Sequence, residues 1–346
     1  SFYNLSITLL IIFFCSSIYG LIINGITTTV PTSFRYLLVF TFLATVNQKM
    51  LLRLSFEQLD RLIMALVLFL TFFGIAQILT GNLVYKTGVY RLSSVYGEAV
   101  TGFSLLISTT FLYFYHRFND QNSIKFFVFA FLCFAMVLGT QSRLAIIACF
   151  LLPMIYHLLK LRFSFKSILS TPIVLALLGF LAFLVIAYLN FAPRLLQSFA
   201  FEFQDASSQN RIIAWITVIQ SLSYSELYIG IGPGGFHHRY DLLTGIEKMD
   251  AHFDFVKILV ENGLISLVAY FSVLVVFLWI LLKKVNRTKS GADALAFIVF
   301  LNIFFLSSLH NAFYYFESMM LGYLIIAVVS HNRKNNVDQI QVGASY

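Results

Sequence analysis

Long apolar runs recur along this chain, and they constrain its fold more than any other feature of the sequence. Of the 346 residues, 59% are hydrophobic and only 11% are charged, and the chain contains 39 Phe and 18 Tyr. A soluble fold could not hide that much apolar surface, so the composition indicates a polytopic membrane protein. We therefore predict an all-α fold of membrane-spanning helices.

About 20 apolar residues are needed to cross a bilayer, and this rule predicts about ten spans. The candidate spans cover residues 5–23, 34–47, 61–80, 100–115, 126–140, 144–159, 168–190, 256–282, 294–310 and 318–330. We expect seven transmembrane helices in 1–190, a large loop in 191–255, three more in 256–330 and a cytoplasmic tail in 331–346. The first apolar run has no basic stretch before it and no cleavage site, so we expect a spanning helix rather than a signal peptide, with further sequence upstream.

Basic residues orient the predicted helices, because Lys and Arg accumulate in cytoplasmic loops. Most of them fall in every second loop, and these loops all lie on the same side of the predicted membrane; they include the loops around Lys49, Lys160 and Lys283. With these loops in the cytoplasm, the 191–255 loop faces outward.

The outward loop contains a second helical pattern, in the segment RIIAWITVIQSL. Its larger apolar residues recur at helical spacing and include a tryptophan suited to the headgroup region: Ile212, Trp215, Ile216 and Ile219. This spacing predicts an amphipathic helix lying in the membrane interface, with Arg211 at its start.

A glycine-rich motif, GIGPGG, follows that helix at residues 230–235. It lacks the Gly-Lys-Ser/Thr of a phosphate loop, so it does not indicate a nucleotide site. Four glycines and a proline in six residues predict a tight turn, and direct contact of the motif with a ligand stays open as an alternative.

Histidines and acidic residues gather behind this turn, at His237, His238, His252 and Asp254. A metal site is not favoured, because adjacent histidines rarely point at one ion and Arg239 would repel a cation. A pair of catalytic carboxylates is not favoured either, since the polarity of the loop explains its acidic residues. We therefore predict neither a metal nor another cofactor.

Three arginines lie at the outer ends of predicted helices: Arg91, Arg143 and Arg211. Any one of them could be an interfacial anchor. Three together on the outer side run against the usual charge bias, because helix-flanking positive charge belongs mainly in the cytoplasm. Converging guanidinium groups would bind a pyrophosphate through charge-assisted hydrogen bonds, so we predict that they line one outward cavity that binds a lipid-linked pyrophosphate.

The ordered set of motifs resembles the O-antigen ligase and polymerase family of bacterial membrane glycosyltransferases. The resemblance runs from about Arg91 to Leu267, through YRLSSVYGEAVTGF, GTQSRLAIIACFLL, NRIIAWITVI, GIGPGGF and AHFDFVKILVENGLISL. It implies that His252 is the essential histidine of the loop, and that Arg143 and Arg211 hold an undecaprenyl pyrophosphate. In this chain Phe253 follows the histidine, where the family often has asparagine.

The chemistry of glycan transfer fits the same residues. An acceptor hydroxyl must lose its proton, which suits His252 as a general base, and the departing pyrophosphate must be stabilised, which suits arginines. We expect further substrate contacts from a second group of residues, in which the tyrosines stack on sugars: Arg91, His237, His238, Arg239, Tyr90, Tyr96 and Tyr240.

The predicted function is polymerisation of O-antigen or related repeat units, with inversion, at the outer face of the bacterial inner membrane. The expected partners are an undecaprenyl-pyrophosphate-linked donor and acceptor, the bilayer and a chain-length regulator, with no nucleic acid. Two alternatives stay open: a ligase that transfers the glycan to lipid A core, and a flippase for lipid-linked oligosaccharides. A flippase should carry its charges deep in the bundle, whereas most basic residues here lie at helix ends.

Overall fold

The computed structural model describes residues 2–24, 26–45, 54–86, 89–96, 99–160, 206–245, 251, 253–306, 315 and 318–329. These residues are mostly helical, and the chain divides into two compact units. The first unit comprises 1–48, 202–279 and 308–316, and the second comprises 49–201, 280–307 and 317–346.

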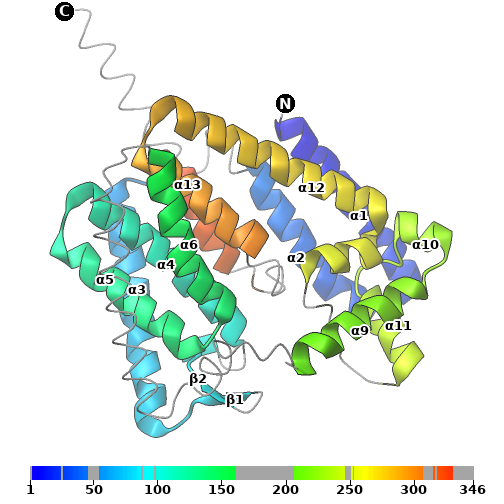
Figure 1. The fold of residues 1–346 in the computed structure, drawn as a ribbon. Helices are drawn as coiled ribbons and strands as arrows, with labels where there is room; N and C mark the ends of the chain where they lie inside the picture. The colour runs from blue at the N-terminus through cyan, green and yellow to red at the C-terminus, as the bar shows by residue number, and fades with distance from the viewer. Residues whose placement is uncertain are drawn as a thin grey trace, which may run out of the picture. The chain divides into compact units, whose positions relative to one another are not determined.

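The second unit is built around α4 (Val100–Gln121), which is buried on all sides over most of its length. Helices α5 (Ile124–Thr140), α6 (Arg143–Lys160) and α13 (Gly291–Leu301) pack against it, as Figure 1 shows. A π-helical turn, η2 (Asn302–Leu306), follows α13, and the Asn302 amide donates to Ser108 Oγ and Thr109 Oγ1 at 3.1 and 3.0 Å. Such side-chain hydrogen bonds join helices where the surroundings are apolar.

Helix α3 (Phe56–Thr80) and a short hairpin complete the described part of this unit, together with an apolar helix at Ser318–Val329. A capping box starts α3, because Ser55 accepts from the Gln58 amide and the Gln58 side chain accepts from the Ser55 amide. Gly81 ends α3 in the left-handed conformation, with φ of 69°.

The hairpin corrects the all-α prediction. Strands β1 (Val84–Lys86) and β2 (Val89–Arg91) pair antiparallel with Tyr85 opposite Tyr90, and a 3₁₀ turn, η1 (Ser94–Tyr96), follows. The rings of the two tyrosines lie 4.9 Å apart and are exposed. Two three-residue strands are too short to show an alternating pattern, which is why the sequence did not reveal them.

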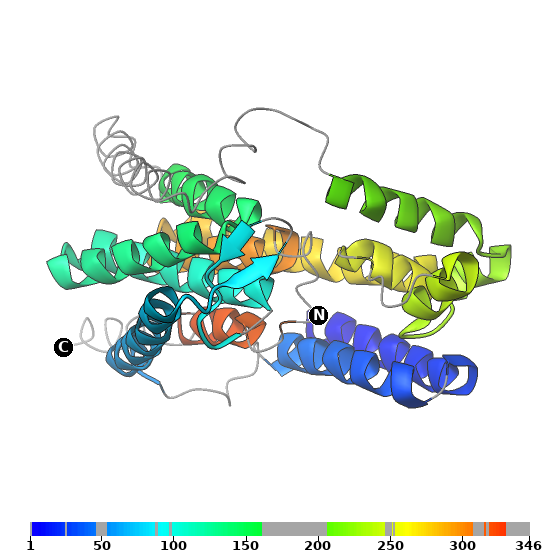
Figure 2. The same ribbon diagram turned by 90° about the horizontal axis from the view of Figure 1, so that it is seen from below.

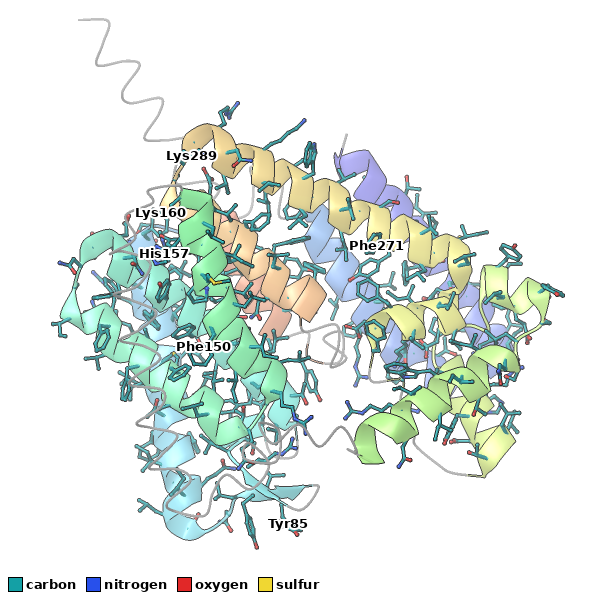
Figure 3. All side chains as sticks on the ribbon, viewed as in Figure 1. Tyr85, Phe150, His157, Lys160, Phe271 and Lys289 are labelled. Carbon is teal, nitrogen blue, oxygen red and sulfur yellow. The ribbon has the colours of Figure 1, made fainter. Side chains whose placement is uncertain are left out.

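Several basic residues of the second unit lie at one end of it. Figure 3 shows His157 and Lys160 at the C-terminal end of α6 and Lys289 at the same end of the unit, with Tyr85 of the hairpin at the opposite end. Because α6 begins at Arg143, that arginine lies toward the hairpin end. The charge-based orientation, in which Lys160 is cytoplasmic and Arg143 outward, stays a prediction.

A buried ion pair joins α3 to α4 in this unit. The Arg117 guanidinium donates to both carboxylate oxygens of Asp60, at 2.9 and 2.6 Å, and the Tyr113 hydroxyl donates to Asp60 Oδ1 at 2.7 Å. The guanidinium also lies 5.3 Å from the ring centre of Phe56 and 5.1 Å from that of Phe126. Asp60 and Arg117 are each 5% exposed.

The first unit contains α1 (Phe2–Asn24), α2 (Ile26–Thr45), α9 (Ala206–Gln220), α10 (Tyr224–Ile229), α11 (Gly235–Thr244) and residues 254–279 of α12 (Asp254–Thr288). Helices α1 and α2 run side by side, which Figure 2 shows clearly. Helix α9 packs against α11, and α11 also touches α1.

Three of the described helices are long and apolar enough to cross a membrane: α3, α6 and α12. Shorter apolar helices occupy Leu10–Asn24, Ile124–Thr140, Gly291–Phe304 and Ser318–Val329. The chain is thus an integral membrane protein with helices at most of the predicted spans. The count of about ten spans stays a prediction, and the predicted span at 168–190 and the tail at 331–346 lie outside the described residues.

Candidate functional site

The glycine motif forms a tight turn between α10 and α11, as the sequence predicts. Gly230, Gly232 and Gly234 all have positive φ, at 89°, 87° and 82°. The turn is buried and hydrogen-bonds to α12: Ile231 N donates to Val260 O at 3.0 Å, and Gly232 N donates to Glu261 O at 2.8 Å. The motif is therefore an internal docking element, with its backbone joined to the helix that follows the loop.

The turn is glycine-rich because other backbone segments lie directly against it. A Cβ on Gly230 would collide with the backbone of Glu261 and Asn262, and one on Gly232 would collide with Gly20 of α1. In turn, a Cβ on Gly20 would lie 2.6 Å from Pro233 Cδ. The Asn24 side chain of α1 also donates to Ile231 O at 2.7 Å. Glycine is required here for close approach as well as for positive φ.

Helix α12 is broken at Gly263, where φ is 80° and ψ is 171°. A Cβ at this position would collide with the backbone of Tyr228 and Ile229, so the break is where α10 meets α12. The sequence predicts one continuous span at 256–282, because the apolar runs ILV and LISLV lie close on either side of the short polar stretch ENG. The structure instead separates a nine-residue half-helix, 254–262, from the rest of α12.

The predicted general base, His252, lies outside the described residues, but both of its neighbours are described. Ala251 is fully buried and its carbonyl accepts a hydrogen bond from the Trp215 indole nitrogen. The Phe253 ring lies 5.5 Å from the Trp215 ring. The chain on either side of His252 is therefore held against α9.

Helix α9 begins at Ala206, five residues before Arg211, so this half-buried arginine lies in the second turn rather than at the helix start. One turn later, Trp215 packs against a small core together with Ile219. The sequence predicts that Trp215 lies among lipid headgroups, but its indole bonds to Ala251 instead. Ile212 and Ile216 are each 49% exposed and form the outer face of the helix.

That small core belongs to the loop, and α11 contributes to it. Its buried members are Ala214, Val218, Ile231, Phe236, Tyr240, Ala251 and Val260. Tyr240 is only 7% exposed, and the stacking of its ring on a sugar stays a prediction. His238 is exposed and His237 half-buried on the same helix.

Arg239 ties α11 to α10. Its guanidinium donates to Ser221 O at 3.1 Å and pairs with the Glu226 carboxylate, which also accepts from the Ser223 amide at 2.8 Å. Burial alone would raise the pKa of Glu226, but these hydrogen bonds and the charge of Arg239 lower it overall. Arg239 thus has a structural partner, whereas the sequence suggests a substrate contact.

In the second unit, the segments that carry Arg91 and Arg143 are hydrogen-bonded to each other. Leu92 N donates to Gly139 O at 2.9 Å, and the Gln141 amide donates to Tyr90 O at 3.1 Å. Gln141 has the left-handed φ of 52°, which turns the chain from α5 into α6 at the exposed Arg143. Two predicted phosphate-binding residues therefore flank one junction.

The predicted tyrosines of this unit differ in exposure. Tyr90 is 54% exposed and lines an apolar cavity of about 320 Å³ between α3 and α5, together with Gln141, Leu92 and Met136. Tyr96 is half-buried, with its hydroxyl 3.4 Å from Ser318 Oγ. Of the two, Tyr90 is the more exposed, and its stacking on a sugar stays a prediction.

Sequence reasoning missed a buried charged pair on the half-helix. Lys257 Nζ lies 4.0 Å from Glu261 Oε1, and both side chains are almost completely buried. The signal was available, because VKILVENG places opposite charges four residues apart in an apolar run, where ionisable residues usually have a function.

Arg211 and the neighbours of His252 belong to the first unit, whereas Arg91 and Arg143 belong to the second. Their convergence in one cavity stays a prediction. Within the described residues, no group of three His, Cys, Asp or Glu is placed to hold a metal ion.

Residues 128–271 match the family model described as O-antigen ligase. This match supports the O-antigen ligase and polymerase family, a glycosyltransferase-like family, over a stretch that includes α6, the loop and the broken helix. The matched stretch begins after Arg91, so the hairpin lies outside it. No curated protein and no solved structure matches the chain.

Proposed function

We propose that this chain is a membrane glycosyltransferase that transfers a glycan from undecaprenyl pyrophosphate to a sugar hydroxyl. The family match over residues 128–271 carries this proposal, because that stretch contains Arg143, Arg211 and His252 in one ordered set. The anchored neighbours of His252 add support, since a catalytic group must be held in a fixed geometry.

In the proposed reaction, the acceptor hydroxyl attacks the anomeric carbon from the face opposite the pyrophosphate. The new glycosidic bond forms as the bond from carbon to the pyrophosphate oxygen breaks, so the configuration inverts. The hydroxyl proton passes to His252, since histidine titrates near neutral pH. Undecaprenyl pyrophosphate leaves with the bonding electrons, and Arg143 and Arg211 stabilise its charge without a metal ion.

The remaining residues have different supporting roles. Arg91 contributes to the phosphate site beside Arg143, and the exposed Tyr90 offers a ring for a sugar to stack on. His237 and His238 face the acceptor, and Tyr96 lines the same side. Arg239 and Tyr240 act indirectly, because the ion pair with Glu226 and the loop core hold α11 in place.

The proposed acceptor is another lipid-linked repeat unit, which makes the enzyme a polymerase with a chain-length regulator as a partner. The proposed location is the bacterial inner membrane, with the site on the periplasmic face. This orientation places the Arg143 end of α6 outward and the Lys160 end in the cytoplasm, as the bias of basic residues favours.

The test is in vitro transfer by the purified protein in lipid nanodiscs. Defined undecaprenyl-pyrophosphate repeat units are supplied with and without lipid A core, and empty nanodiscs serve as the control. Longer lipid-linked chains identify a polymerase, and label on the core identifies a ligase. If the folded protein forms neither product, the proposed function is wrong.

A further inference from the structure

The half-helix 254–262 carries a pair of opposite charges that is removed from solvent. Lys257 is 1% exposed and Glu261 is 0% exposed, with 4.0 Å between Lys257 Nζ and Glu261 Oε1. That distance is longer than a hydrogen bond, so this contact is a charge pair with loose geometry. Removing two charges from water is costly, and only excellent geometry repays the cost. Stability alone is therefore a poor explanation for this pair.

Glu261 and its neighbour Asn262 connect three other parts of the first unit to the half-helix. Its carboxylate accepts a hydrogen bond from the Tyr36 hydroxyl of α2 at 2.9 Å, and its backbone carbonyl accepts from Gly232 of the glycine turn at 2.8 Å. The next residue, Asn262, accepts from the Ser16 hydroxyl of α1 at 2.6 Å. The C-terminal end of the half-helix is thus fixed to α1, α2 and the turn.

The N-terminal end of the half-helix leads directly to His252. Lys257 N donates to Phe253 O at 3.0 Å, so residue 253 belongs to the first helical turn. At a rise of about 1.5 Å per residue, the half-helix is about 13 Å long. A small tilt at Glu261 would therefore displace Phe253 at the far end.

We propose that Glu261 is a positioning residue, whose charged carboxylate locks the half-helix 254–262 so that the segment 251–253 is held at the reaction site. The function of that segment rests on the proposed function, but the mechanical link does not. Lys257 balances the charge of Glu261, and the hydrogen bond from Tyr36 sets the orientation of the Glu261 carboxylate. Glu261 does not touch the substrate.

A spectroscopic test needs no substrate. The chain has two tryptophans, and replacing the exposed one (Trp279→Phe) leaves Trp215, whose indole bonds to Ala251, as the only emitter. In this background Glu261→Gln should shift the Trp215 emission to longer wavelength, because the indole separates from residue 251. Asp60→Asn is the matched control, since it also removes a buried carboxylate from a cation; it should lower the melting temperature without shifting Trp215.

A kinetic test measures the effect of the same substitution on glycan transfer. At saturating donor, Glu261→Gln should lower kcat by about ten- to a hundred-fold, the loss expected from a displacement of about 1 Å, while KM for the donor changes little. Tyr36→Phe, which removes one hydroxyl, should also lower kcat, by a smaller factor. This variant serves as the test if Glu261→Gln does not fold. Unchanged emission and unchanged kcat in both variants would overturn the proposal.

The two tests separate this proposal from the proposed function. If the parent protein transfers no glycan, the emission test still decides whether Glu261 positions residues 251–253. If Glu261→Gln loses activity only in proportion to its loss of folded protein, with Trp215 emission unchanged, Glu261 is merely structural and the proposal is wrong.

Discussion

Two buried ion pairs, one in each unit, differ in geometry. In the second unit, Arg117 donates two hydrogen bonds to the Asp60 carboxylate, at 2.9 and 2.6 Å. In the first unit, Lys257 and Glu261 face each other at 4.0 Å. Both pairs are almost free of solvent, so both carry a desolvation cost.

The difference in geometry indicates a difference in role. The Arg117–Asp60 pair is bidentate and is supported by a tyrosine hydroxyl and two aromatic rings. These contacts offset much of its desolvation cost and hold α3 to α4. The direct contact between Lys257 and Glu261 offsets less of the desolvation cost of that pair, yet the pair lies on the half-helix that follows His252. We therefore expect the first pair to contribute mainly to stability and the second mainly to activity.

Replacing His252 should have the largest effect of all. If the lysine pair serves the reaction, then the segment it positions should contain the reacting group. His252→Gln should lower the transfer rate by about 10²–10⁴-fold with donor binding retained, because a general base contributes that much. Single-turnover transfer from pH 5.5 to 8.5 measures it, with His238→Gln as the comparison that should lose less. A rate above about a tenth of the parent would place the base elsewhere.

Breaking the arginine pair should affect stability instead. Asp60→Asn leaves Arg117 buried beside a neutral amide, and breaking a buried pair costs about 3–5 kcal/mol. Thermal unfolding in detergent should show the loss, while the transfer rate per folded molecule stays at the parental level. A specific fall in kcat would show that both pairs serve activity, and the contrast between them would disappear.

The half-helix can also be displaced from the side of the glycine turn. Gly263→Ala places a Cβ against the backbone of Tyr228 and Ile229, at a φ that disfavours alanine. We expect at least about a ten-fold loss of kcat, since the half-helix must shift. Gly81→Ala is the control: its φ is also positive, at 69°, but no atom lies within 4 Å of the added Cβ. If both variants lose equal activity, steric displacement is not the cause.

The half-buried surface pair between Glu226 and Arg239 should have the smallest effect. The pKa of Glu226 is lowered in the folded protein, so its contribution to stability is present above the unfolded pKa of about 4.5 and is lost as pH falls through the folded pKa. A pair this accessible contributes under about 1 kcal/mol. Melting temperatures of the parent and Glu226→Gln should therefore approach each other as the pH falls below about 4.5 and coincide only below the lower pKa of the folded protein. A difference that persists at lower pH would contradict this.

The sequence predicted the helices better than their interruptions. Apolar length located α3, α6 and α12, and Ser55 with Gln58 is a readable start signal for α3. The break at Gly263 was not predicted from the sequence, because its cause is the backbone of Tyr228, which is 35 positions away in the chain.

The site was predictable in its residue types but not in its contacts. Arginines and histidines stand out in a chain with few charges, and the spacing of Lys257 and Glu261 was visible. The bond from Tyr36 to Glu261 joins residues 225 positions apart, so no local pattern could indicate it. Trp215 was misread for the same reason, since an interfacial tryptophan and one that bonds to Ala251 look alike in sequence.

The contact of the glycine turn with α1 has a consequence for assembly of the protein in the cell. Asn24 meets Ile231 across 207 positions of the chain, and Gly20 meets Pro233 in the same place. At a synthesis rate of about 5–20 residues per second, the first helix waits on the order of 10–40 s for its partner. During that time Asn24 lacks its final partner, so the packing of α1 can be completed only after the glycine turn has been synthesised.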